Sequence, residues 1–211
     1  MNETLLKKKI KAVVFDCDGV MFDTDNANKM YYNGILSHFG RQEMTQEEFE
    51  YAHMSPVKEA LAFLFKDLPV MDDVLEYCKT LTYDSLIPHM IIEPGLRGLL
   101  KKLVGRYITA IATNRSNTMN GVLQYHELTQ DFQLVVTSLD VENPKPHPDQ
   151  LFRITEHFNI EPTEVLYIGD STTDEQAALQ AGVVFISFDN RALEADYHIT
   201  SLKEIEKLLK I

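Results

Sequence analysis

Two aspartates separated by one residue, Asp16 and Asp18, stand near the N-terminus and are followed by Gly19. Carboxylates at this spacing can bind a hard cation, act as a nucleophile, or donate and accept protons. The glycine permits a sharp turn where the chain leaves a strand, and after such a turn both carboxylates can point into one crevice. By itself the pair is equally consistent with an acidic turn that closes a strand.

Three later segments supply other chemical groups. Thr113 and Asn114 offer a hydroxyl and an amide, Lys145 lies in a proline-rich stretch, and Asp170 with Asp174 adds two more carboxylates. Taken singly, these residues have ordinary roles as helix caps or solvated charges. Taken together, and in this order along the chain, a hydroxyl, a cation and two carboxylates around the first pair favour one catalytic site.

The elements that position these groups alternate along the chain. Short apolar runs that do not alternate with polar residues and are rich in β-branched residues are typical of strands buried on both faces. Stretches with helical character lie between the later runs, and Gly182 suits the C-cap of the last helix. The predicted strands are Ala12–Phe15, Ile108–Ala112, Leu134–Val136, Val165–Ile168 and Val183–Ile186, and the predicted helices are Asn117–Tyr125, Pro148–Phe158 and Thr172–Ala181. This alternation predicts an α/β fold with a Rossmann-like parallel sheet, and such sheets bind ligands at the carboxyl ends of their strands.

A long segment between the first two predicted strands has a different pattern of apolar residues. Apolar residues recur at helical spacing from about Phe22 to about Pro88, in stripes that end at glycine or proline, and Pro88–Gly95 suits a return linker. We therefore expect a helical insertion over the carboxyl ends of the strands. The predicted domains are an α/β core of residues 1–21 and 89–211 and a helical cap of residues 22–88.

The charge of the chain excludes some partners. Its 211 residues carry 20 Lys and Arg against 32 Asp and Glu, a formal net charge of −12, which repels nucleic-acid backbones and anionic lipid surfaces. Two cysteines are too few for a disulfide framework, and the seven histidines show no zinc-like spacing. No run reaches the length of a membrane span, and the lysine-rich start lacks the apolar stretch of a signal peptide. We expect a cytoplasmic protein that binds neither nucleic acid nor membranes, and no pattern indicates its oligomeric state.

With these motifs in this order, the chain resembles the haloacid dehalogenase (HAD) superfamily of aspartate-nucleophile hydrolases over nearly its whole length. Asp16–Val20 is similar to the first motif of that family, Thr113 to the second, Lys145 to the third and Gly169–Asp174 to the fourth. The helical insertion resembles the small cap of the phosphoglycolate phosphatase-like and β-phosphoglucomutase-like branch. The cap matches in size and helical character only.

The resemblance implies a role for each matched residue. Asp16 would attack phosphorus in line and form an aspartyl phosphate, and Asp18 would protonate the leaving alcohol and later deprotonate water. Thr113 and Lys145 would bind phosphoryl oxygens, and Asn114 would belong to the same substrate site. Family members that act on haloalkanoates or phosphonates lack an aspartate two positions after the nucleophile, so Asp18 favours phosphoester chemistry.

The resemblance also implies a metal ion. In this family Mg²⁺ is held by the equivalents of Asp16, the main-chain carbonyl of Asp18 and Asp170, and Asp174 matches a carboxylate that supports the metal directly or through water. Clustered aspartates are themselves a hard oxygen site suited to Mg²⁺, whose charge cancels the repulsion between a carboxylate nucleophile and a phosphate dianion. The predicted metal-binding residues are therefore Asp16, Asp18, Asp170 and Asp174.

Two classes of function stay open on the sequence. The favoured one is a Mg²⁺-dependent phosphatase for a small phosphorylated metabolite, with a phosphosugar mutase as a variant of it, and the other is a non-catalytic binding protein on the same fold. Arg115 is equally consistent with an anion contact and with an exposed arginine at a helix start. No readable pattern encodes the substrate. Residues of the insertion that could face the crevice, and could equally cap helices, are Asp23, Thr24, Asn26, Asn28, Lys29 and Lys58.

Overall fold

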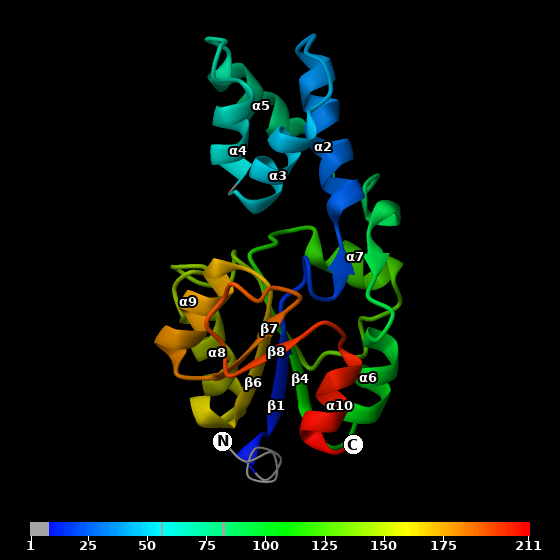
Figure 1. Ribbon diagram of the computed structural model, residues 1–211, viewed down its shortest axis with the longest axis vertical. Helices are drawn as coiled ribbons and strands as arrows, with labels where there is room; N and C mark the ends of the chain where they lie inside the picture. Colours follow the sequence, from blue (N-terminus) through cyan, green and yellow to red (C-terminus); the bar gives the residue numbers. More distant parts are fainter. Residues whose placement is uncertain (1–8, 56, 82) are drawn as a thin grey trace. The chain divides into compact units, whose positions relative to one another are not determined.

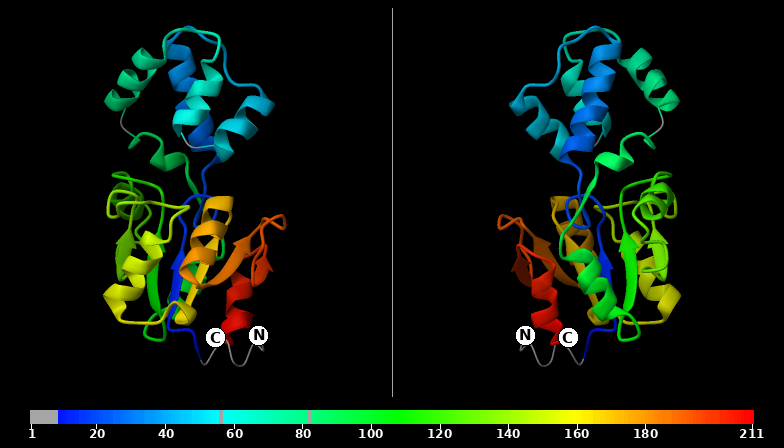
Figure 2. Two further views of the ribbon diagram at one scale, coloured as in Figure 1. Left: turned by 90° about the vertical axis from the view of Figure 1, so that its left-hand side faces the viewer. Right: turned by 90° about the vertical axis from the view of Figure 1, so that its right-hand side faces the viewer.

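The structure, a computed structural model, describes residues 9–55, 57–81 and 83–211. Most of the lysine-rich start, for which no signal peptide is predicted, lies outside these residues. The chain divides into two compact units (Figure 1, Figure 2): the larger contains the residues up to Asp23 together with Ile92–Ile211, and the smaller is Thr24–Ile91. That residues 22–88 act as a cap stays a prediction.

A parallel sheet forms the centre of the larger unit. Its strands are β1 (Ala12–Phe15), β4 (Ile108–Ala112), β5 (Leu134–Val136), β6 (Val165–Gly169), β7 (Val184–Phe188) and β8 (Tyr197–Ile199). Among the described residues they are ordered β5-β4-β1-β6-β7-β8, and every neighbouring pair is parallel. The predicted α/β fold with a Rossmann-like parallel sheet is confirmed, and β8 is a strand that the sequence analysis did not predict.

Strand β1 lies in the middle of the sheet. It pairs with β4 on one side and with β6 on the other, so that Ala12 is opposite Ile108 and Val165. All residues of β1 are fully buried. Because both faces of a parallel sheet are covered by helices, such a strand has no solvent side and shows no alternation of polar and apolar residues.

Helices cover both faces of the sheet (Figure 2). They are α6 (Leu96–Leu103), α7 (Met119–Tyr125), α8 (Asp149–Phe158), α9 (Thr172–Ala181) and α10 (Lys203–Leu209), and η2 (Pro162–Glu164) is a short 3₁₀ helix. Helices α8 and α9 pack together on one face, and α6 and α10 pack together on the other. Helix α9 ends, as predicted, at Gly182, whose φ of +72° is left-handed. Helices α6 and α10 were not predicted.

The core under α8 and α9 is made of aliphatic and aromatic side chains from both layers. Val14 of β1 and Tyr167 of β6 belong to one buried cluster with Leu151 and Ile154 of α8 and Ala177 of α9. Burying one large apolar side chain contributes about 1.5–3 kcal/mol. The ends of the central strands are therefore fixed by a well-packed core.

The smaller unit is a helical bundle with its own core. Its helices are α2 (Asp25–His38), α3 (Gln46–Met54), α4 (Val57–Leu64), α5 (Met71–Thr80) and the 3₁₀ helix η1 (Ile87–His89). Tyr32, Ile35 and Leu36 of α2 share one buried cluster with Leu61 and Leu64 of α4, as their helical spacing predicts. In the part of the chain that the structure describes, no helix combines the length and apolar character needed to cross a membrane.

The first two residues of the predicted insertion are not helical. Phe22–Asp23 forms strand β2, which pairs with β3 (Ile91–Ile92). The expectation of a helical insertion from its first residue is therefore wrong at this point. The two short strands are hydrogen-bonded to each other, so their backbone groups have partners.

Candidate active site

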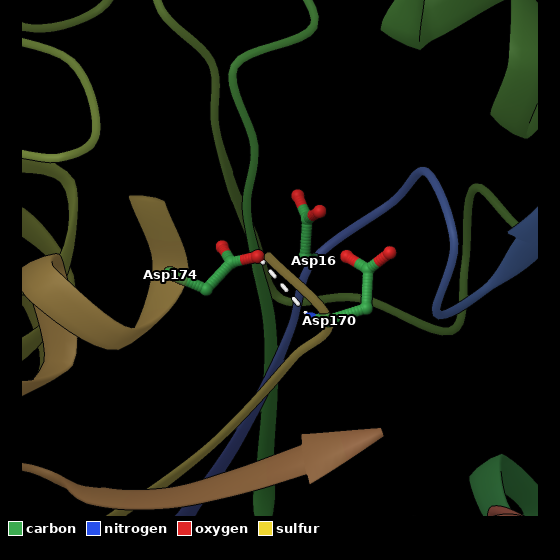
Figure 3. A group of neighbouring side chains, drawn as sticks. All are labelled: Asp16, Asp170 and Asp174. Carbon is green, nitrogen blue, oxygen red and sulfur yellow. Dashed lines mark hydrogen bonds between the residues drawn. The ribbon is translucent and has the colours of Figure 1, made fainter. Parts of the chain in front are cut away.

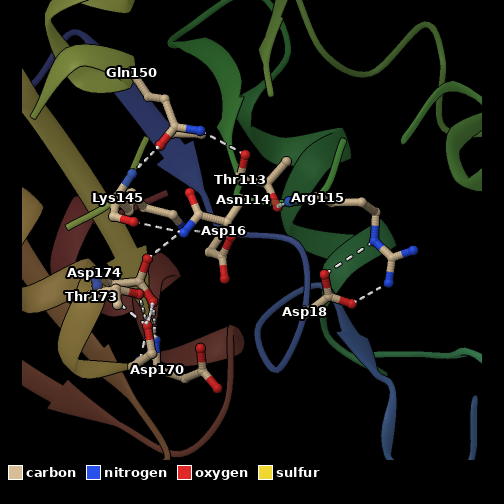
Figure 4. Close-up of polar contacts among 12 residues, drawn as sticks. Asp16, Asp18, Thr113, Asn114, Arg115, Lys145, Gln150, Asp170, Thr173 and Asp174 are labelled. Atoms are coloured by element: carbon tan, nitrogen blue, oxygen red, sulfur yellow. Dashed lines mark hydrogen bonds and ion pairs between the residues drawn. The ribbon is translucent and has the colours of Figure 1, made fainter. Parts of the chain in front are cut away.

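Three neighbouring strands end at residues that the sequence singles out. Asp16 follows β1, Thr113 follows β4 and Asp170 follows β6. Because these strands are parallel neighbours, their carboxyl ends meet at one edge of the sheet, and the three side chains lie close together (Figure 4). Lys145 reaches the same place from the segment before α8. The structure thus brings predicted residues from four segments into one site.

Three carboxylates form a cluster in this site (Figure 3). Asp16, Asp170 and Asp174 each offer one oxygen, and these oxygens lie within 4.8 Å of one another. Asp174 is fully buried and Asp16 is 7% exposed, so water screens their repulsion poorly. Carboxylate oxygens grouped in this way are the donors that Mg²⁺ and other hard divalent cations prefer. The cluster therefore fits a divalent metal ion.

The electrostatics of the cluster agree with this fit. Burial raises the pKa of Asp16 to about 7, and the charge of Asp174 adds to the effect although Lys145 opposes it. Burial also raises the pKa of Asp170 to about 8, with further contributions from Asp16 and Asp174. Ionising these carboxylates together therefore costs free energy. A doubly charged cation among them would offset that cost.

Lys145 supplies positive charge to the site. Its Nζ donates hydrogen bonds to Asp16 Oδ1 at 2.8 Å and to Asp174 Oδ1 at 2.6 Å. The Lys145 side chain is 2% exposed. Although burial alone lowers the pKa of Lys145, the two carboxylates outweigh it and raise that pKa above its ordinary value. The ammonium group therefore stays charged and holds Asp16 in one orientation.

Tyr167 and Gln150 are buried residues of the site that were not predicted from the sequence. Tyr167 in β6 donates its hydroxyl to Asp174 Oδ1 at 2.5 Å and accepts from Lys145 Nζ at 3.0 Å. Gln150 in α8 accepts the main-chain N–H of Lys145 at 3.2 Å and donates to the Thr113 carbonyl at 2.6 Å. Both stand on apolar faces of their elements, where a buried polar group needs a partner. That requirement is the signal that could have identified them.

Hydrogen bonds within the protein fix the segment after β4. Thr113 is 1% exposed, and its hydroxyl oxygen accepts the main-chain N–H of Arg115 at 3.1 Å. A hydroxyl that accepts in this way can still donate its proton to a ligand. The Asn114 amide donates to the Lys145 carbonyl at 2.8 Å and so joins two segments of the site. A substrate-binding role for Asn114 stays a prediction.

Asp18 lies beside Arg115 (Figure 4). Its side chain is 36% exposed and forms a two-point ion pair, with Arg115 Nη2 2.5 Å from Oδ1 and Nε 3.1 Å from Oδ2. The Arg115 side chain is 7% exposed. The alternative in which Arg115 is an exposed arginine at a helix start is therefore wrong. Among the described residues, the carboxylate of Asp18 is not part of the metal-fitting cluster, and a metal-binding role for its main-chain carbonyl stays a prediction.

Gly19 lets the turn after β1 pass close to Asp170. Its φ is +77°, a conformation that residues with a side chain rarely adopt. A Cβ atom at this position would lie 2.0 Å from Asp170 Oδ2, far inside contact distance. The turn therefore needs glycine both for its backbone conformation and for the space that it leaves.

Gly19→Ala is expected to displace the Asp170 carboxylate and, if the cluster binds the divalent cation that it fits, to weaken that binding by about tenfold or more, the size of effect that supporting changes around metal ligands have. Isothermal titration calorimetry with Mg²⁺ measures the affinity. Gly98→Ala in α6 is the matched control, because nothing lies within 4 Å of a Cβ at that position and alanine favours a helix. Equal Mg²⁺ affinity in Gly19→Ala and in wild type would contradict the inference that the Asp170 carboxylate needs the space that Gly19 leaves.

Most of the insertion residues suggested to face the crevice lie in the smaller unit, and some have partners within it. The Asn28 amide nitrogen lies 3.1 Å from His53 Nδ1, and Asn28 Oδ1 accepts the Tyr83 hydroxyl at 3.1 Å. Lys29 Nζ lies 4.3 Å from the centre of the Phe49 ring. These contacts give Asn28 and Lys29 structural roles in the unit. A substrate-facing role for the six candidates stays a prediction.

Comparisons with known proteins agree with the geometry of the site. The chain is 30% identical over 218 residues to a phosphoglycolate phosphatase from Nitrosospira multiformis, which covers 95% of this chain and 96% of the relative. The solved structure of a HAD-superfamily hydrolase of subfamily IA, variant 1, from Geobacter sulfurreducens has a TM-score of 0.85 at 38% identity and covers 95% of this chain and 97% of that chain.

Two further matches differ in what they show. A β-phosphoglucomutase from Clostridium difficile has a TM-score of 0.73 at 20% identity and covers 95% of this chain and 97% of that chain, a likeness that shows the fold alone. A family model described as haloacid dehalogenase-like hydrolase matches residues 13–188, which run from β1 to β7 and contain every strand end that builds the site. The chain therefore belongs to the haloacid dehalogenase-like hydrolase family.

Proposed function

We propose that this hydrolase is a Mg²⁺-dependent phosphatase that acts on a small phosphorylated metabolite through an aspartyl phosphate on Asp16. The observation that carries the proposal is the position of Asp16, which directly follows the central strand, belongs to the carboxylate cluster and accepts a hydrogen bond from Lys145 at 2.8 Å. The similarity to a phosphoglycolate phosphatase over nearly the whole chain supports the same class of substrate.

The first half-reaction transfers the phosphoryl group to the protein. A carboxylate oxygen of Asp16 forms a bond to phosphorus while the bond between phosphorus and the ester oxygen breaks. Lys145 holds Asp16 through Oδ1, so the carboxylate can present its other oxygen, and the ammonium charge offsets the repulsion of the incoming phosphate. Asp18 donates a proton to the departing ester oxygen, which leaves as an alcohol.

The second half-reaction returns Asp16 to its starting state. Asp18, now ionised, accepts a proton from water as the water oxygen attacks phosphorus. The bond between phosphorus and the Asp16 oxygen breaks, and inorganic phosphate leaves. The Thr113 hydroxyl donates to a phosphoryl oxygen in both steps, and Lys145, whose three N–H groups donate to Asp16, Asp174 and Tyr167, offsets the phosphoryl charge through its own positive charge. One water is consumed for each ester, and the proton that Asp18 gives to the alcohol is replaced by the proton that it takes from water.

Mg²⁺ fits the carboxylate cluster, where Asp16, Asp170 and the main-chain carbonyl of Asp18 would hold it. Asp174 would support the metal directly or through water, and it is itself fixed by the main-chain N–H of Ser171 at 3.1 Å and the Ser171 hydroxyl at 2.5 Å. When bound, the ion offsets the negative charge of the carboxylates and of the phosphate. Mg²⁺ usually keeps several waters, which suits a site with few protein ligands.

Removal of the metal is expected to abolish activity, because Asp16 then faces a phosphate dianion without sufficient positive charge. Release of inorganic phosphate is measured after EDTA treatment and again after each ion is added back. Mg²⁺ should restore activity, and Ca²⁺ should restore it poorly, since the larger ion tolerates geometries that spoil in-line attack. Full activity in the presence of chelator would contradict the proposed requirement for a metal ion.

The partner proposed here is a small metabolite in the cytoplasm. The formal net charge of −12 opposes binding to nucleic acid and anionic lipid. Both cysteines are free, and Cys17 is buried, which suits a reducing compartment.

Hydrolysis of p-nitrophenyl phosphate with and without Mg²⁺ tests the proposed activity directly. A screen of phosphorylated metabolites, beginning with phosphoglycolate and sugar phosphates, then ranks substrates by kcat/KM. Conversion of β-glucose 1-phosphate to glucose 6-phosphate faster than phosphate release from any ester would replace the phosphatase by a mutase. Binding of esters without turnover would instead favour a non-catalytic binding protein.

A further inference from the structure

Arg115 is a charged residue of the site that has no part in the reaction described above. Its guanidinium meets Asp18 at two points, Nη2 with Oδ1 at 2.5 Å and Nε with Oδ2 at 3.1 Å. Nη1 donates to Thr118 Oγ1 at 3.2 Å, which further fixes the plane of the guanidinium. Two parallel N–H···O bonds determine both the position and the rotation of a carboxylate, whereas one bond leaves the rotation free.

The two partners of this pair differ in how firmly they are held. The Arg115 side chain is 7% exposed and that of Asp18 is 36% exposed. The main chain of Arg115 is fixed on both sides, because its N–H donates to Thr113 Oγ1 at 3.1 Å and its carbonyl accepts from Ser138 at 3.3 Å. Asp18 stands in the glycine-containing turn after β1. The arginine is thus the fixed partner, and the aspartate is the one whose orientation the pair determines.

We propose that Arg115 is a positioning residue that orients the acid–base carboxylate of Asp18, an inference that rests on the proposed phosphatase function. The alternative is direct contact of Arg115 with the phosphoryl group. The geometry favours positioning, since the Nε and Nη2 edge of the guanidinium, which would suit two phosphate oxygens, faces the Asp18 carboxylate. Positioning also explains why an arginine rather than a lysine suits this place, because an ammonium group cannot form the two-point contact.

Orientation of a general acid has a kinetic signature that a general weakening of the fold lacks. Alkyl phosphates release an alkoxide, which must be protonated, whereas 2,4-dinitrophenyl phosphate releases a stable phenolate that needs no acid. The parameter kcat/KM covers the steps up to departure of the leaving group, so it isolates the role of Asp18 as acid from its later role as base. Loss of orientation should therefore slow alkyl esters selectively.

Arg115→Met in the Mg²⁺-loaded enzyme is expected to lower kcat/KM about thirtyfold for the best alkyl phosphate of the metabolite screen. A general acid contributes about 10²–10⁴-fold to the rate, and a misoriented acid should lose a part of that contribution. For 2,4-dinitrophenyl phosphate the expected loss is below about threefold. Arg115→Lys should lie between Met and wild type for the alkyl ester. Arg97→Met is the matched control, because its guanidinium donates to the His126 carbonyl at 2.5 Å on the exposed surface, and it should change neither value.

A double-mutant cycle with Asp18→Asn separates the two roles of Arg115. If Arg115 acts through Asp18, then Arg115→Met causes no further loss on the alkyl ester when Asp18 is already asparagine. Equal losses on the two esters, or a full additional loss in the Asp18→Asn background, would overturn the proposal in favour of direct phosphate contact. Failure of the phosphatase proposal itself is distinct, since the wild-type enzyme would then hydrolyse neither ester.

Discussion

Asp16→Asn is expected to lower phosphatase turnover by at least about four orders of magnitude while the protein stays folded, because the amide keeps the shape of the side chain but lacks the charge with which we propose that Asp16 attacks phosphorus. The same change removes the negative charge of one proposed metal ligand. Steady-state release of inorganic phosphate in saturating Mg²⁺ measures the loss, and thermal unfolding measures the fold.

The matched control for this substitution is Asp73→Asn in α5, which removes an exposed carboxylate from the smaller unit and should leave turnover within twofold of wild type. If the Asp16→Asn enzyme kept turnover within about tenfold of wild type, Asp16 would not be the nucleophile. Loss of a covalent nucleophile lowers turnover by far more than about tenfold. The carboxylate cluster would then have to act through the metal alone.

Lys145→Met is expected to lower both activity and stability. The ammonium is the shared partner of Asp16 and Asp174 at 2.8 and 2.6 Å, and removing one member of a buried ion pair costs about 3–5 kcal/mol in the free energy of unfolding. Activity should fall about 10³-fold, since the proposed mechanism loses one charge that stabilises the phosphoryl group. Urea unfolding and phosphate release measure the two effects on the same preparations.

Lys101→Met in α6 is the control for this second change, because Lys101 is exposed and surface substitutions usually alter stability by less than about 0.5 kcal/mol. Lys145→Arg should not restore function, since the site around Lys145 is closed and a planar guanidinium is larger than an ammonium. Unchanged stability in Lys145→Met would mean that Asp16 and Asp174 do not need this counter-charge, which would contradict the geometry of the site.

The central strands could be predicted from the sequence because their environment leaves a clear pattern. β1, β4 and β5 begin and end where predicted, since strands covered on both faces are apolar throughout. β7 runs on to Phe188, beyond its predicted end, because the hydroxyl of Ser187 is buried but bonds to the Asn190 carbonyl. A polar residue with a partner can continue a buried strand. β8 and α10 are short, and elements of that length depend on packing more than on their own sequence.

The site could be predicted in part for a related reason. Asp16, Thr113 and Asp170 each follow an apolar strand, and parallel strands bring their ends together. The pair formed by Asp18 and Arg115 could not be predicted, because it joins positions 97 residues apart and depends on the register of β1 against β4. The role of the Tyr167 hydroxyl could not be predicted for another reason, since an aromatic residue in an apolar strand is usually part of the core.

Asp174 connects the proposed active site to the start of α9 through two oxygens of one side chain. Oδ1 faces Lys145 and Tyr167, while Oδ2 accepts from Ser171 as part of the capping box that begins α9. Natural selection for activity and natural selection for a correctly started helix therefore act on one side chain. Drift at this position is constrained twice over, and a lineage that abandoned catalysis would still have a reason to keep an acidic residue there.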